Sequence, residues 1–152
     1  MPILSRSLTD THPKIRTSAH EALTLIGSTI RNPELTLIVD VLIKSIADPF
    51  YENKKGLNIL LKTEFAHFID VPALSLIVPI IEYALTSRDQ ESKELAGKIV
   101  ATITFLIKDP RDLMPYLKML IKALKEAVCD HLTEVRTIAS KAFGSLAKKL
   151  SF

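Results

Sequence analysis

The sequence predicts an all-α solenoid, a stack of helix pairs, and three observations support this fold class. The segment 134–150 carries apolar or small residues at steps of three and four, which places them on one face of a helix. The segment 13–30 matches it after a shift of 120 positions, so two distant helices are copies of one unit. Four aspartates then recur at intervals of 38, 41 and 41 residues, a spacing close to that of two-helix repeats: Asp10, Asp48, Asp89 and Asp130.

The repeats form one predicted domain that covers residues 1–152, since a chain of this length is typical of a single domain. The first repeat is expected to be truncated, because residues 2–8 supply barely two turns of its first helix. Its second helix, 13–30, is of full length and starts with a proline, which suits the first position of a helix. The predicted repeats span about 1–31, 32–69, 70–108 and 109–152.

Each of the other repeats is predicted to contain two helices, which brings the total to seven or eight with turns at the four aspartates. Pro79 lies inside the apolar stripe of one of these helices and should kink it, because proline removes a main-chain hydrogen bond. A strand over 99–107 is a weaker interpretation than a helix. The expected helices are 33–46 and a segment ending between 65 and 68, then a segment opening at 70–72 and 91–107, then 113–128 and 134–150.

Composition narrows the class of protein. The apolar content of 47% fits a well-packed chain rather than a disordered one. The single Cys129 cannot form an internal disulfide, which favours a reducing compartment. The start of the chain lacks the apolar run of a signal peptide, and prolines interrupt the best candidate for a membrane span, 71–81. We therefore expect a cytoplasmic protein with no membrane as a partner.

Longer strings give a more specific indication than the repeat pattern. Helix pairs with an Asp turn and a second helix of the type V-R-x-x-A-x-x-A-L/F-G-x-L resemble HEAT repeats over essentially the whole chain. Four strings together resemble the central HEAT region of the translational activators of general amino-acid control, which is itself similar to the HEAT domain of fungal translation elongation factor 3. These strings are IGSTIRNPEL (26–35), FAHFIDVPALSLIVPII (65–81), DLMPYL (112–117) and EVRTIASKAFGSLAKKL (134–150).

This resemblance implies a ribosome-associated scaffold that helps an initiation-factor kinase to sense uncharged tRNA and stalled or colliding ribosomes. It also implies an ATP-binding-cassette protein among the partners. Proteins of this family are very long and bind the kinase elsewhere, so direct contact with the kinase is not implied. Two alternatives stay open: a generic protein-binding HEAT module of the transport or phosphatase type, and a metal-dependent HEAT enzyme.

The residues themselves do not indicate catalysis or a cofactor. Cys129 and His131 are two residues apart, which does not place both on one face of a helix. The pair His20-Glu21 is similar to the ligand pairs of HEAT-like di-iron hydroxylases, but the equivalent positions in the fourth repeat are Ser140-Lys141. All four glycines are isolated within helical patterns, so no phosphate-binding loop is present. We expect no enzymatic activity.

A basic surface in the fourth repeat is the best candidate for binding. Residues 108–152 carry a net charge of +4, whereas 1–107 carry −1. A purely solvated helix face stays open as the alternative. With three tyrosines and no tryptophan, base stacking is not expected, so the best functional interpretation is contact with phosphates or with an acidic protein, in keeping with a ribosomal partner. DNA is not an expected partner. The candidate contact residues are Lys118, Lys122 and Lys125 at helical spacing, Arg111 upstream, and Lys141, Lys148 and Lys149 on the next helix.

A second set of charged residues is expected to fix the register of the repeats. Each repeat aspartate is followed within four to six residues by a basic side chain, and stacking would align the two kinds in adjacent columns. The residues of this expected ladder between repeats are Asp10 and Arg16, Asp48 and Lys54, Asp89 and Lys93, and Asp130 and Arg136. Because the first repeat is short, and Leu146 and Leu150 have no following repeat, we also expect flanking HEAT repeats or a partner to cover the ends.

Overall fold

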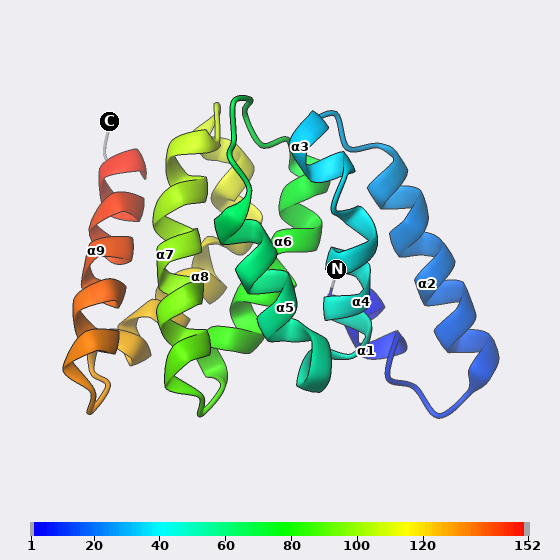
Figure 1. The fold of residues 1–152 in the computed structure, drawn as a ribbon, viewed down its shortest axis with the longest axis horizontal. Coiled ribbons are helices and arrows are strands. Elements are labelled where there is room, and N and C mark those ends of the chain that lie inside the picture. Colours follow the sequence, from blue (N-terminus) through cyan, green and yellow to red (C-terminus); the bar gives the residue numbers. More distant parts are fainter. Residues whose placement is uncertain (1, 151–152) are drawn as a thin grey trace.

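Antiparallel helix pairs follow one another along the long axis of the computed structural model, which describes residues 2–150 and the side chains of 3–150 (Figure 1). The fold is the all-α solenoid that the sequence predicts. The first helices of the repeats form one layer, in which α4 packs on α6 and α6 packs on α8. This layer contains α1 (Pro2–Ser7), α4 (Val39–Ala47), α6 (Val71–Thr86) and α8 (Met114–Val128), with the short helix α3 (Pro33–Thr36) before α4 and the 3-10 helix η1 (Pro110–Leu113) before α8.

The second helices form the other layer, in which α5 packs on α7 and α7 packs on α9. Here α2 is an exception, because it packs against α1, α4 and α6 of the first layer. Proline occupies one of the first two positions of α2, α3, α5 and α6, where its missing N–H costs no helical hydrogen bond. The second layer contains α2 (Pro13–Ser28), α5 (Pro49–Lys62), α7 (Gln90–Leu106) and α9 (Thr133–Leu150).

The core lies between the two layers, and α6 is its most buried helix. Leu74, Ile77 and Ile81 of α6 are fully buried, and Pro79 lies within the same helix, as expected. At Gly97 of α7 a Cβ atom would lie 2.6 Å from Ile138 of α9, so the two helices approach each other more closely than any larger residue would allow. The helical interpretation of the segment before Ile107 is confirmed.

Three expectations about the helices require correction. Within residues 2–150 the structure contains nine α-helices rather than seven or eight, because 33–46 is split at Ile38, whose φ of −116° and ψ of 8° interrupt the helix between α3 and α4. The split arises because Asn32 fixes α3 against another loop, while α4 follows the core. Helix α5 ends at Lys62 rather than at 65–68, because the following residues form hydrogen bonds to other segments.

The two ends of the solenoid differ in burial. Leu146 is 2% exposed and belongs to the core, so the expectation that it lacks cover is wrong; it faces the interior rather than the open end of the stack. Leu150 packs against the same core. At the other end, Ile15 and Leu25 of α2 are exposed. Within the part of the chain that the structure describes, no helix combines the length and the apolar character of a membrane span.

Candidate functional site

The turns between the two helices of each repeat lie along the lower edge of the solenoid in Figure 1. We call these turns, residues 8–12, 48, 87–89 and 129–132, the lower edge. Two ion pairs there join successive repeats. The Nζ atom of Lys54 lies 3.0 Å from Asp89 Oδ2, and the Nζ atom of Lys93 lies 2.6 Å from Asp130 Oδ2. Lys54 also lies 2.8 Å from Glu91 Oε2.

The end repeats use their basic residues differently. The Nη1 atom of Arg16 donates to the carbonyl oxygen of Asp10 at 2.7 Å, within its own turn. Arg136 does the same in the last turn, where its Nη1 atom donates to the carbonyl oxygen of Asp130 at 2.9 Å. Asp48 forms no ion pair with any described residue. Each of two junctions is thus bridged by one predicted lysine and one predicted aspartate. Arg16 and Arg136 instead bond within their own turns.

The two ion pairs of the lower edge differ in burial. The side chains of Lys93 and Asp130 are 18% and 7% exposed, whereas those of Lys54 and Asp89 are 44% and 49% exposed. Hydrogen bonds from the hydroxyl and N–H of Ser92, followed by Lys54, lower the pKa of Asp89 to about 2. Lys93, followed by the N–H of Leu132, lowers the pKa of Asp130.

The connections between repeats lie along the opposite edge, at the top of Figure 1. We call these connections, residues 29–32, 63–70 and 107–109, the upper edge. Asn32 is 3% exposed and joins two of them. Its Nδ2 donates to the carbonyl oxygens of His67 at 3.2 Å and Phe68 at 3.0 Å, while its Oδ1 accepts from the N–H of Leu35 at 2.9 Å. One buried amide therefore both caps α3 and holds the 63–70 connection.

Further contacts fix the same connection. Glu34 Oε1 accepts from the N–H of Ala66 at 3.2 Å and lies 2.7 Å from His67 Nδ1, and this contact with His67 is the main reason that the pKa of Glu34 is lowered. The N–H of Ile69 donates to the carbonyl oxygen of Leu106 at 2.9 Å. The spacing and composition of the sequence do not indicate this network, although the strings 26–35 and 65–81, which provide both sides of it, carry part of the resemblance to the family.

The acidic side of this network has two unsatisfied atoms. Asp70 Oδ2 accepts from the N–H of Arg31 at 2.9 Å, which adds a further link between the connections. Asp70 Oδ1 and Glu34 Oε2 are buried without a hydrogen-bond partner among the described residues. A buried carboxylate oxygen of this kind carries a desolvation penalty, so the connection is held at some cost in stability.

The predicted basic surface is divided between the two layers. Lys118, Lys122 and Lys125 are exposed on α8, on the side of the helix opposite its buried leucines. Lys141 and Lys148 are exposed on α9 and Lys149 is half-buried there. Because α9 packs on α8 from the other layer, the lysines form two separate groups. Arg111 forms a bidentate pair with Asp109 at 2.8 to 3.1 Å, so much of its charge is neutralised.

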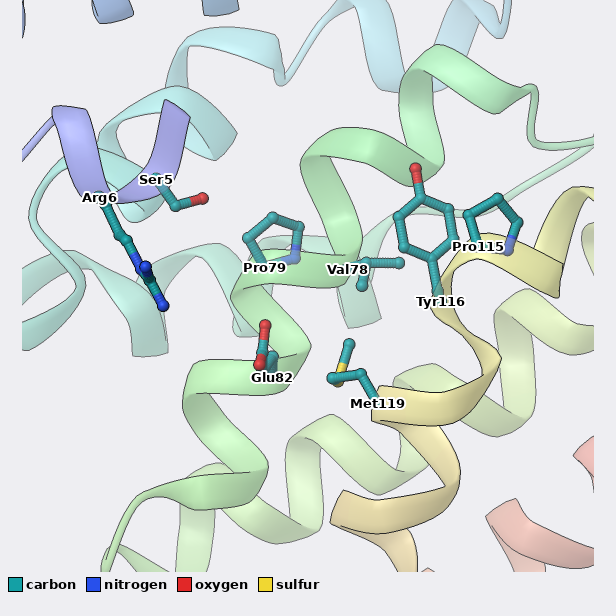
Figure 2. A pocket seen from close by; sticks show the side chains of 8 residues that line it. All are labelled: Ser5, Arg6, Val78, Pro79, Glu82, Pro115, Tyr116 and Met119. Carbon is teal, nitrogen blue, oxygen red and sulfur yellow. The ribbon is translucent and has the colours of Figure 1, made fainter. Parts of the chain in front are cut away.

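A groove of about 510 Å³ lies on the first layer between α1, α6 and α8. Figure 2 shows Pro79 and Glu82 of α6 between Arg6 of α1 on one side and Tyr116 and Met119 of α8 on the other. The Tyr116 hydroxyl lies 3.0 Å from Ser75 Oγ and ties α8 to α6. Among residues 2–150 there is no group of three or more His, Cys, Asp and Glu side chains arranged to hold a metal ion.

Comparison with known proteins places this solenoid in a family. Residues 52–151 match the model of the elongation factor 3/GNC1 HEAT repeat. The chain is 40% identical over 148 residues to the human protein named stalled ribosome sensor GCN1. The aligned region covers 97% of this chain and 6% of that protein. It is 37% identical over 150 residues to the Saccharomyces cerevisiae eIF-2-alpha kinase activator GCN1, with 99% and 6% covered. Elongation factor 3 of Pneumocystis carinii is 29% identical over 151 residues, with 97% and 14% covered.

The match thus extends over nearly all of this chain but only a small part of each relative. The repeat architecture of the structure agrees with the family model, since all described helices fall into the two layers of a helical solenoid. The chain belongs to the elongation factor 3/GNC1 HEAT-repeat family.

Proposed function

We propose that this chain is a non-catalytic HEAT-repeat scaffold that associates with the ribosome and promotes signalling by the initiation-factor kinase under stress. The observation that carries the proposal is the 37–40% identity, over nearly the whole chain, to proteins named as a stalled ribosome sensor and as an eIF-2-alpha kinase activator. The chain spans about 6% of the length of these relatives. Its role would therefore be to provide one contact within a larger assembly.

The α8 lysine row, Lys118, Lys122 and Lys125, supports this proposal as the site of contact. The row is exposed, lies off the core stripe and forms no ion pair with a described residue. Three unpaired cations on one helix face attract a phosphate-rich surface and release its counterions on binding. A contact of this size would position the scaffold without reading sequence.

The partners follow from the same proposal. The ribosome is the primary partner, through either ribosomal RNA phosphate or an acidic ribosomal protein, and the compartment is the cytoplasm. Flanking HEAT repeats and an ATP-binding-cassette protein are further proposed partners. A generic protein-binding module of the transport or phosphatase type is the competing function, and it predicts no affinity for ribosomes.

Pelleting with purified ribosomes tests the proposal. The parent chain should pellet with ribosomes at low salt and much less at high salt, because phosphate contacts are strongly salt-dependent. The triple variant Lys118→Glu/Lys122→Glu/Lys125→Glu should lose pelleting at both salt concentrations. Its helical content should not change, because the three positions are exposed.

A matched variant separates a local contact from net charge. Lys14, Lys44 and Lys98 are exposed lysines on α2, α4 and α7, and their triple change to Glu alters the net charge equally. This control should pellet like the parent. Equal loss in both variants would mean that net charge alone drives binding, and full pelleting of the α8 variant would reject the α8 lysine row as the contact. If the parent does not pellet at all, the ribosome-associated function is wrong.

A further inference from the structure

We propose that the upper edge, together with the adjoining helix ends at Lys62 and Phe105, is a binding site for single-stranded RNA. The rings of Phe68 and Phe105 stack on unpaired bases, and Arg31, Lys62 and Lys108 contact phosphates. This inference rests on the proposed function only for the source of the RNA, an unpaired segment of ribosomal RNA. The binding chemistry follows from the structure of the edge. It uses a surface different from the α8 lysine row.

Main-chain contacts bring these residues to one place. The N–H of Ile69 donates to the carbonyl oxygen of Leu106 at 2.9 Å, so Phe68 and Phe105 each lie one residue before a bonded position. Lys108 follows Ile107, which forms an isolated parallel bridge with Ile69. The backbone positions of Phe68 and Phe105 are thus fixed relative to each other by main-chain contacts.

Arg31 and Lys62 are adjacent to the same connection. The N–H of Arg31 donates to Asp70 at 2.9 Å, two residues after Phe68. Lys62 is the last residue of α5 and leads directly into the 63–70 connection. Hydrogen bonds to Asn32 and Glu34 already hold the 63–70 connection in one conformation. The connection therefore loses less conformational entropy when it binds a partner than a mobile loop would.

The aromatic rings are open to solvent. Phe68 is 59% exposed and Phe105 is 71% exposed, although both are large apolar residues. The expectation that bases do not stack on this chain counts only tyrosine and tryptophan, whereas two phenylalanine rings are exposed at neighbouring segments. An exposed ring face is what base stacking requires, and each stacked base contributes about 1–3 kcal/mol.

The charges around the rings favour an anion. Arg31, Lys62 and Lys108 are all exposed, and none forms an ion pair with a described residue. Glu64 is an exposed carboxylate on the same connection, and the half-buried Asp70 accepts a hydrogen bond from the N–H of Arg31. The attraction for phosphate therefore rests on the exposed positions of the three cations rather than on a net positive charge. The nearby Glu34 and Asp109 are already engaged by His67 and Arg111.

Unpaired RNA fits this surface better than an acidic peptide does. A peptide gains affinity by inserting anchor side chains into pockets, whereas the two rings stand out from the edge. Unpaired bases offer flat faces to such rings, and their phosphates offer charge to the flanking cations. A duplex would satisfy the cations but hide its base faces, so the rings would contribute nothing.

Fluorescence anisotropy with a labelled single-stranded oligo(U) RNA tests the inference without ribosomes. The parent chain should bind, and Phe68→Ala/Phe105→Ala should weaken binding by about tenfold or more. The control Phe50→Ala/Tyr51→Ala removes two exposed rings from the region next to the lower edge and should leave the affinity unchanged. Duplex RNA of the same length should bind more weakly than the single strand.

Several results would overturn the inference. These are no binding of the single strand by the parent, an unchanged affinity of the Phe68/Phe105 variant, equal losses in both double variants, or a duplex that binds as well as the single strand. Displacement of the RNA by an oligoglutamate peptide together with an unchanged affinity of the Phe68/Phe105 variant would identify an acidic protein as the occupant instead. Ribosome pelleting distinguishes the two proposals, because oligonucleotide binding without pelleting keeps the RNA site and rejects the ribosome as its source.

Discussion

The two edges of the solenoid hold neighbouring repeats together in different ways. The lower edge uses charged side chains close to short turns, and its contacts repeat from one junction to the next. The upper edge uses an amide and carboxylates that bind main-chain groups of a long connection, and these contacts do not repeat. An exposed ion pair contributes little, whereas a buried amide leaves several groups unsatisfied when it is removed. The upper edge should therefore carry more stability.

Removal of the buried amide should have the largest effect. Asn32→Ala leaves the carbonyl oxygens of His67 and Phe68 and the N–H of Leu35 without their partner, so we expect a loss of about 3 kcal/mol in the free energy of unfolding. Asn58→Ala is the matched control, because the Nδ2 atom of Asn58 donates to the carbonyl oxygen of Lys54 within its own helix. This substitution should cost less than about 1 kcal/mol. Urea denaturation measures both, and equal losses would remove the difference between the edges.

The two ion pairs of the lower edge should differ from each other. Lys93→Ala leaves the buried carboxylate of Asp130 unpaired, so we expect a loss of about 2 kcal/mol in the free energy of unfolding. Lys54→Ala breaks a pair that is nearly half exposed and should cost less than about 1 kcal/mol. Urea denaturation at low and high salt would show this, since only the exposed pair is strongly screened. A larger loss for Lys54→Ala would contradict the assignment by burial.

The smallest expected effect concerns acid. The pKa of Asp89 is about 2 in the folded chain and near 3.8 in the unfolded one, so its contribution is present above about pH 4 and is lost as the pH falls toward 2. Asp89→Asn keeps an oxygen for the N–H of Ser92 but cannot titrate. Between pH 4 and 2, the parent should therefore lose more unfolding free energy than this variant does. Parallel pH dependences would show that Asp89 does not report on the lower edge.

The parts of this molecule that repeat could be predicted from the sequence. The helical spacing of apolar residues predicted the layers, and the spacing of the aspartates predicted the turns. Lys54 and Lys93 could be identified as candidates because each follows a repeat aspartate. The sequence does not indicate which aspartate each lysine reaches, or that Arg136 bonds to its own turn. Both depend on the stagger between neighbouring repeats, which cannot be read from a single sequence.

The upper edge could not be predicted by the same reasoning. Asn32 contacts residues 35 and 36 positions away, and nothing in the local sequence indicates that pairing. That the lysines of α8 and those of α9 form separate groups likewise depends on how the two layers pack against each other. Only the resemblance to the family indicated that the segments 26–35 and 65–81 matter. In the structure the two segments are joined by the hydrogen bonds of Asn32 and Asp70.

The difference in burial between the two ion pairs has a mechanical consequence. The junction between the second and third repeats is closed at the lower edge by the exposed Lys54–Asp89 pair, while the hydrogen bond from the N–H of Ile69 to the carbonyl oxygen of Leu106 ties its opposite side. Bending there should take place as a rotation about an axis along the upper edge, with the lower edge opening. At the next junction, Gly97 and the buried Lys93 leave no such freedom. The third and fourth repeats should therefore move as a rigid body, and ionic strength should set the curvature of the solenoid at a single joint.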